Sequence, residues 1–160
     1  MTHSRKQEPI IAFKPMIAED LPFLLSVRNQ VKDNLHDQNE FTLDEATAWW
    51  QITDSRYWII LRGEQQVGYF RVKRISGETW QIGADIDPVF QRQGIAGRAY
   101  PHFVREVLLP LGVTTLELRV LKKNSVAFNL YLKLGFDVAE ETDTDYRMIQ
   151  SAKPFITRRT

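Results

Sequence analysis

The sequence contains no cysteine, which excludes a disulfide framework, a thiolate nucleophile and a zinc–thiolate centre. The formal net charge is only +1, which argues against a broad nucleic-acid-binding surface. No apolar run is long enough to span a bilayer, and residues 1–9 lack the apolar centre of a signal peptide. No histidine–carboxylate cluster indicates a metal, and no nucleophile elbow indicates a serine hydrolase. We therefore expect a cytoplasmic protein with no metal and with neither a nucleic acid nor a membrane as partner.

The composition is that of an ordinary globular protein. Of 160 residues, 43% are hydrophobic and 26% are charged. This length suits one domain with a sizeable core. We predict a single domain over residues 1–160, with flexible termini at residues 1–9 and 153–160.

Hydrophobic periodicity and turn signals predict the element order β α α β β β α β α β β. The predicted helices begin near residues 18, 42, 94 and 126, and Pro101 implies a kink in the third, which runs to about residue 109. A helix joins the strands that start at residues 79 and 113, so these two should be parallel and the other pairs antiparallel. The predicted fold class is α/β of the mixed α+β kind, a twisted mixed sheet of about seven strands with helices on both faces.

A stretch with the character of an anion site lies between a predicted strand and a predicted helix. The first amides of a helix lack intrahelical acceptors and lie at the positive end of its dipole, and a glycine lets the backbone approach a phosphate. The stretch is neither a Walker loop nor a dinucleotide fingerprint. An ordinary helix start with a helpful glycine remains the alternative. Its residues are Gln91, Arg92, Gln93, Gly94, Ile95, Ala96 and Gly97.

Two motifs in this order resemble those of the GCN5-related N-acetyltransferase (GNAT) family. The stretch from Gln91 to Ala96 is similar to the acyl-CoA turn, Gln/Arg-x-x-Gly-x-Gly/Ala. Residues 124–136 are similar to the signature N-x-x-A-x-x-L-Y-x-K-x-G-F. The resemblance covers residues 10–151, and residues 27–29 and 82–83 look like the branch that acetylates ribosomal-protein N-termini or nucleotide-linked amino sugars.

The resemblance implies an enzyme that transfers an acetyl group from acetyl-CoA to a primary amine by direct attack. In this family the amides of the turn bind the pyrophosphate, and the parallel strands splay apart to admit the pantetheine arm, near the Ile86 backbone and the residues that match Asn124 and Asn129. Tyr131 would protonate the leaving thiolate. A core tyrosine and a plain helix N-cap are the structural alternatives for Tyr131 and Asn124. Arg92 adds charge near the phosphates or is simply exposed.

The proton acceptor and the amine are less well defined. Asp85 is the carboxylate nearest the reacting end in sequence, with a water relay as the alternative base. We expect Arg28 and Trp49 to contact the acceptor, a small-molecule or peptide amine, under a loop that contains His36. A non-catalytic acyl-CoA-binding module and a module for another phosphate ligand remain alternatives. Edge strands would allow a homodimer.

Overall fold

The computed structural model describes residues 9–152, so the predictions for the chain termini fall almost entirely outside the described residues. Within that range the chain forms one seven-stranded sheet with the order β1-β2-β3-β4-β5-β7-β6. The element order and the antiparallel β2-β3-β4 meander are as predicted. The strands are β1 (Ile11–Pro15), β2 (Arg56–Arg62), β3 (Gln65–Ser76), β4 (Thr79–Ile86), β5 (Thr115–Leu121), β6 (Asp137–Glu141) and β7 (Asp145–Ser151).

Four α-helices cover the sheet within residues 9–152, and each begins at a recognisable signal. In α2 the Glu45 amide donates to the Thr42 hydroxyl at 3.2 Å, and the Thr42 amide donates to the Glu45 carboxylate at 3.0 Å. No helix in this range has the length and apolar character needed to cross a membrane. The helices are α1 (Leu21–Val31), α2 (Leu43–Trp50), α3 (Ile95–Phe103) and α4 (Ser125–Lys133), with short turns η1 (Ala18–Asp20), η2 (Lys32–Asn34) and η3 (Pro88–Phe90).

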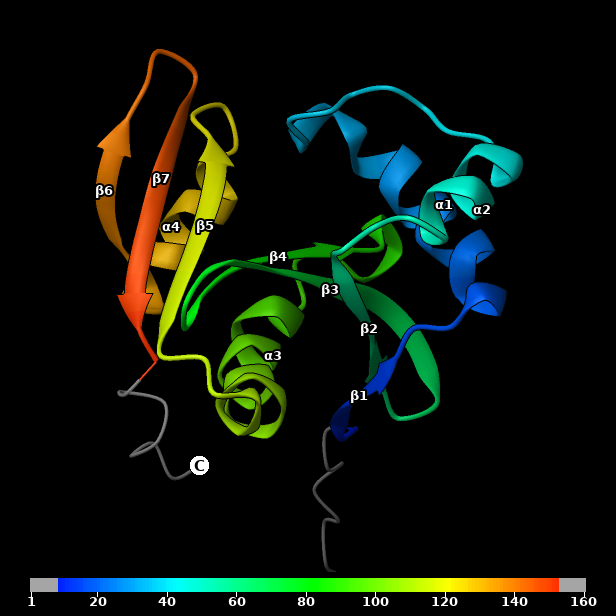
Figure 1. Ribbon diagram of the computed structural model, residues 1–160, viewed down its shortest axis with the longest axis horizontal. Coiled ribbons are helices and arrows are strands. Elements are labelled where there is room, and N and C mark those ends of the chain that lie inside the picture. Colours follow the sequence, from blue (N-terminus) through cyan, green and yellow to red (C-terminus); the bar gives the residue numbers. More distant parts are fainter. Residues whose placement is uncertain (1–8, 153–160) are drawn as a thin grey trace, which may run out of the picture.

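The sheet opens between β4 and β5. This pair is parallel, and its register runs only from Thr79–Thr115 to Gln81–Glu117. Beyond it β4 continues to Ile86 and β5 continues to Leu121, so the two strands diverge toward their carboxyl ends. Figure 1 shows the resulting wedge, with β5, β7 and β6 on one side and β1, β2 and β3 on the other. The parallel pair and its divergence agree with the expectation from sequence.

Each face of the sheet carries its own apolar cluster. On one face, α3 and α4 pack on alternate residues of the strands, and the rings of Phe70 and Phe103 stack with centroids 4.0 Å apart. On the other face, α1 and α2 pack on Tyr57, Ile59 and Tyr69. Because side chains alternate across a strand, the residues next to Tyr69 at every second position also lie on the α1 side. The helices therefore cover both faces, as predicted.

The third helix differs from the single kinked helix expected from sequence. It is α-helical to Phe103, continues as a π-helix, η4 (Val104–Leu108), and ends in a 3₁₀ turn, η5 (Leu109–Leu111). Pro101 has no amide proton and its ring crowds the preceding turn, so the hydrogen-bond ladder is interrupted there. A widened π turn after such a break keeps the apolar side chains Val104 and Leu108 fully buried.

Candidate active site

The turn before α3 presents a row of backbone donors. Gly94 is the N-cap of α3 with φ of +72°, in the left-handed region that favours glycine. The first helical bond is donated by the Arg98 amide to the Gly94 carbonyl, at 3.2 Å. In the described part of the chain, the amides of residues 94–97 donate to no acceptor. They lie at the positive end of the helix dipole, which suits a phosphate.

The side chains of this turn brace it from within. The Gln91 amide group donates to the Ile86 carbonyl at 3.1 Å, and the Gln93 side-chain oxygen accepts from Arg62 at 2.5 Å. Arg92 is exposed and has φ of +64°, a conformation that costs a non-glycine residue energy. Gln91 and Gln93 were predicted to contact the cofactor, and the structure shows that their side chains hold the turn to β4 and β2. A ligand would meet the backbone here.

The diverging end of β4 offers a second set of backbone groups. The Asp87 amide donates to the Val67 carbonyl of β3 at 2.9 Å. Because amides alternate in direction along a strand, those of Ala84 and Ile86 point the other way, toward β5. The β4–β5 register ends at Gln81, so these two amides lie beyond the last paired residues. An extended ligand chain can pair with such an edge as an added strand would.

A cavity of about 480 Å³ opens at the divergence, on the α1 side of the sheet. This volume is in the range of small-molecule sites. The cavity brings together residues predicted as site residues, Arg28, Asp85, Asn124 and Tyr131, with other residues of the loop after α1 and of β3, β4 and β5. The latter are Asn34, Leu35, Asp37, Arg71, Gln81, Ile82, Gly83, Ala84, Arg119 and Val120, and His36 completes the lining.

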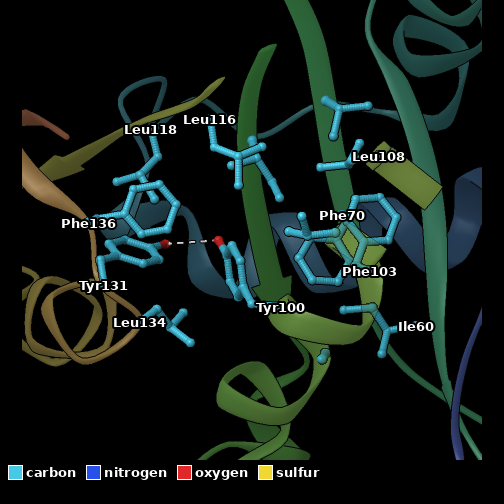
Figure 2. Close-up of a cluster of buried hydrophobic side chains, with 14 of the residues drawn as sticks. Ile60, Phe70, Tyr100, Phe103, Leu108, Leu116, Leu118, Tyr131, Leu134 and Phe136 are labelled. Carbon is cyan, nitrogen blue, oxygen red and sulfur yellow. Dashed lines mark hydrogen bonds between the residues drawn. The ribbon is translucent and has the colours of Figure 1, made fainter. Parts of the chain in front are cut away.

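Tyr131 reaches this cavity from α4, on the opposite face of the sheet from α1. It is 8% exposed and packs edge-on against Tyr100 and Phe136. The Tyr100 hydroxyl donates to the Tyr131 hydroxyl over 3.4 Å, which leaves the Tyr131 proton for another acceptor (Figure 2). Burial raises the pKa of Tyr131, and the charge of Asp85 adds to the rise against the lowering effects of Tyr100 and Arg71. Tyr131 is therefore protonated at neutral pH.

Asp85 lies on the α1 face of β4. Its carboxylate accepts a hydrogen bond of 2.6 Å from the Tyr69 hydroxyl. Burial raises the pKa of Tyr69 well above its ordinary value, and the charge of Asp85 contributes to that rise. One carboxylate oxygen is thus anchored by a proton donor that does not ionise at neutral pH, and the carboxylate borders the cavity.

Of the other predicted site residues, Asn124 borders the cavity, whereas Asn129 and Trp49 do not. Asn124 caps α4, because its side-chain oxygen accepts from the Ala127 amide at 3.3 Å, and it also borders the cavity, whereas its contact with the cofactor stays a prediction. Asn129 is exposed on α4, away from the cavity lining. Trp49 packs against Tyr57 with ring centroids 5.4 Å apart, in the apolar cluster under α1 and α2, and the structure does not place it on the cavity.

Arg28 borders the cavity, but two of its donors are engaged. They bond the backbone carbonyls of Asn39 and Asp37 at 2.6 and 2.8 Å, and the guanidinium lies over the Phe41 ring. The arginine thereby holds the loop after α1 in place. That loop carries His36, whose Nε2 lies 2.9 Å from the Asp145 carboxylate at the start of β7. This contact spans the mouth of the wedge between the two halves of the sheet.

The sequence matches the model of one protein family, described as an acetyltransferase (GNAT) domain, over residues 11–137. The chain therefore belongs to the GNAT acetyltransferase family, whose acetyl donor is acetyl-CoA. A search of curated proteins by sequence found no match.

Solved structures show the same fold at low sequence identity. A domain from Methanocaldococcus jannaschii superposes with a TM-score of 0.80 at 21% identity, covering 90% of this chain and 99% of that one. Spermidine N-acetyltransferase from Vibrio cholerae, in complex with CoA and spermine, gives 0.79 at 16% identity, covering 92% and 98%. An N-acetyltransferase from Staphylococcus aureus gives 0.73 at 17% identity, covering 89% and 99%. At these identities the likeness extends to the fold alone.

Proposed function

We propose that the protein acetylates a primary amine by direct attack of the amine on acetyl-CoA, with Tyr131 as the general acid. The observation that carries this proposal is the convergence at the wedge. Tyr131 enters from the α4 side, and Asp85 borders the same cavity from the α1 side. A hydroxyl that stays protonated and a carboxylate therefore face one space, beside the divergent end of β4.

The chain has groups that fit acetyl-CoA. The amides of residues 94–97 and the α3 dipole suit a diphosphate, and the β4 edge at Ala84 and Ile86 suits the amide groups of a pantetheine arm. Acetyl-CoA, when bound, supplies an acetyl group activated as a thioester. The Ile86 amide would donate to the acetyl carbonyl, where negative charge develops.

Proton movements complete the chemistry. The Tyr131 hydroxyl gives its proton to the sulfur that leaves, because burial keeps it protonated at neutral pH. The attacking amine must lose a proton. Asp85 and a chain of water molecules are the two routes considered, and the Tyr69 bond to Asp85 leaves its second oxygen for this role.

Thiol release from acetyl-CoA over a panel of amines tests the proposal. Tyr131→Phe should lower kcat by about 100- to 10,000-fold and leave CoA affinity nearly unchanged, since general acid catalysis is worth that much. Tyr146→Phe is the matched control, because Tyr146 packs, partly buried, against the same apolar cluster as Tyr131 but does not border the cavity. CoA binding without turnover of any amine would favour the non-catalytic module instead. An unchanged kcat in Tyr131→Phe would remove the general-acid role.

Several features remain predictions. The single domain over residues 1–160, the homodimer, the cytoplasmic location and the absence of nucleic-acid and membrane partners are among them. The acceptor is proposed as a small-molecule or peptide amine, and the spermine bound to the Vibrio cholerae enzyme is one amine to include in the panel.

A further inference from the structure

The cavity has an excess of arginine. Arg28 from α1, Arg71 from β3 and Arg119 from β5 all border it, against two carboxylates, Asp37 and Asp85. Arginine stays charged at every pH that a folded protein experiences. Three guanidinium groups around one small space repel a cation and attract an anion.

The acids of the cavity already accept hydrogen bonds from the protein. Asp37 accepts from the Asn39 backbone amide at 3.1 Å and from its side-chain amide at 2.9 Å. Asp85 accepts from Tyr69 at 2.6 Å. Asp145, which lies behind His36, accepts from the Thr142 hydroxyl at 2.6 Å and lies 3.7 Å from Arg119. These contacts leave the acids less able to bind a cationic substrate.

Arg71 is placed differently from the other two arginines. Its side chain lies on the α1 face of β3, opposite Gly83 of β4 in the antiparallel register. A Cβ atom at Gly83 would lie 2.9 Å from Nη2 and 3.6 Å from Cζ of Arg71. The guanidinium therefore rests against the β4 backbone, in space that only a glycine leaves open. Within residues 9–152, Arg71 forms no ion pair with a carboxylate. Burial lowers the pKa of Arg71, but Tyr57 and then Asp85 raise it, and the net shift is upward, so the guanidinium stays charged.

Arg119 lies across the wedge from Arg71. Its guanidinium is 3.7 Å from Asp145 and its side chain is 39% exposed. Arg28 donates to two backbone carbonyls and also lies 3.9 Å from the Asp37 carboxylate, so its charge is partly offset while it holds the loop. Of the three arginines that border the cavity, Arg71 is therefore the one with no ion pair to a carboxylate that the structure describes, and Arg119 lies across the wedge from it.

We propose that the acceptor amine carries an anionic group, a carboxylate or a phosphate, which Arg71 and Arg119 bind. The planar guanidinium fork matches both groups. Polyamines such as spermidine are disfavoured, because their cations would lie among three arginines. The inference rests on the proposed acetyl transfer and names the substrate class of that same cavity.

Matched acceptors test this proposal by thiol release. One pair is phosphoethanolamine and ethanolamine, another is β-alanine and β-alaninamide, and spermidine represents the polycations. We expect the anionic member of each pair to have the higher kcat/KM and spermidine to rank below both. The two pairs show whether phosphate or carboxylate is preferred. A higher kcat/KM for spermidine or for the members without an anionic group would overturn the proposal.

Substitutions test whether Arg71 causes the preference for acceptors that carry an anionic group. Arg71→Gln should reduce kcat/KM for the preferred acceptor with an anionic group by about 10- to 100-fold and change kcat/KM for its partner without that group little, because one charge-assisted contact is lost. Gly83→Ala should act in the same direction with no change of charge, since the new Cβ displaces the guanidinium. Lys73→Gln is the control, because Lys73 lies on the same face of β3, outside the cavity lining. Equal losses of kcat/KM for acceptors with and without an anionic group would contradict the proposal.

Binding distinguishes failure of this inference from failure of the proposed function. Calorimetry with the CoA-loaded protein measures phosphoethanolamine and β-alanine without any turnover. Binding that is lost in Arg71→Gln, with no amine acetylated, would support the anion site and contradict the acetyl transfer. Turnover of amines at rates that do not depend on an anionic group would support the acetyl transfer and contradict the anion site. Unchanged CoA affinity and melting temperature show that each variant is folded.

Discussion

The sharpest test of the cofactor site compares two glycines of the same conformation. Gly94 and Gly112 have φ of +72° and +85°, and a Cβ atom at either would meet nothing within 4 Å. Gly94 begins α3, whereas Gly112 follows η5 at the far end of the same helical segment. Alanine at either position should therefore lower the free energy of unfolding by a similar amount.

The expected magnitudes follow from the backbone. A left-handed alanine costs about 1–2 kcal/mol, which lowers the melting temperature of a protein of this size by about 2–8 °C. At Gly94 the strain is relieved by rotating φ, and that rotation turns the amides of residues 95–97 away from a ligand. Loss of one charge-assisted contact weakens binding by about 10- to 100-fold. Gly112→Ala should lower the melting temperature in the same way but should not weaken ligand binding.

Calorimetry with CoA and with pantetheine, which lacks the diphosphate, measures the difference. We expect Gly94→Ala to weaken CoA binding but to leave any pantetheine binding as it is, and Gly112→Ala to change neither. Thermal unfolding should show comparable losses of stability in both variants. Wild-type CoA affinity in a destabilised Gly94→Ala protein, or equal weakening in Gly112→Ala, would refute the assignment of the diphosphate to this turn.

Two further predictions concern hydrogen bonds beside the cavity. The hydrogen bond that Tyr100 donates lowers the pKa of Tyr131, so its removal in Tyr100→Phe should raise that pKa. A pH profile of kcat should then show its alkaline limb moved to higher pH and kcat reduced about fivefold. An unmoved limb would argue against Tyr131 as the titrating acid. The Thr142 hydroxyl, and then His36, lower the pKa of Asp145. Its contribution to stability is thus present above its ordinary pKa and lost as the pH falls through the lowered value. Thermal unfolding from pH 7 to the acid range should show a weaker acid dependence in Asp145→Asn, and an identical dependence would exclude this carboxylate.

Local signals predicted the elements well because their causes lie within a few residues. The capping box at Thr42 and Glu45 is formed, Asn124 caps α4, and Gly94 takes the left-handed conformation at the start of α3. The divergence of β4 and β5 was also expected, and there it was the family resemblance that carried the prediction. Pro101 signalled a break, but the π turn after it depends on how Val104 and Leu108 pack in the core.

Features that depend on strand register were not predicted from the sequence. Arg71 and Gly83 face each other only because β3 and β4 pair in one particular register. The contact between His36 and Asp145 joins residues 109 positions apart. The period-2 alternation that places Arg71 on the face of Tyr69 was readable, and combined with the predicted hairpin it would have directed attention to this arginine. Trp49 was assigned to the acceptor from its residue type, and its packing partner Tyr57 lies on a strand whose position the sequence does not reveal.

The measurement that bears most directly on the whole account is a crystal structure of the protein with CoA. We expect the diphosphate to accept hydrogen bonds from the amides of residues 94–97, and the pantetheine arm to run between β4 and β5 toward Tyr131. CoA bound elsewhere, or β5 closed onto β4 along its full length in the complex, would contradict this expectation.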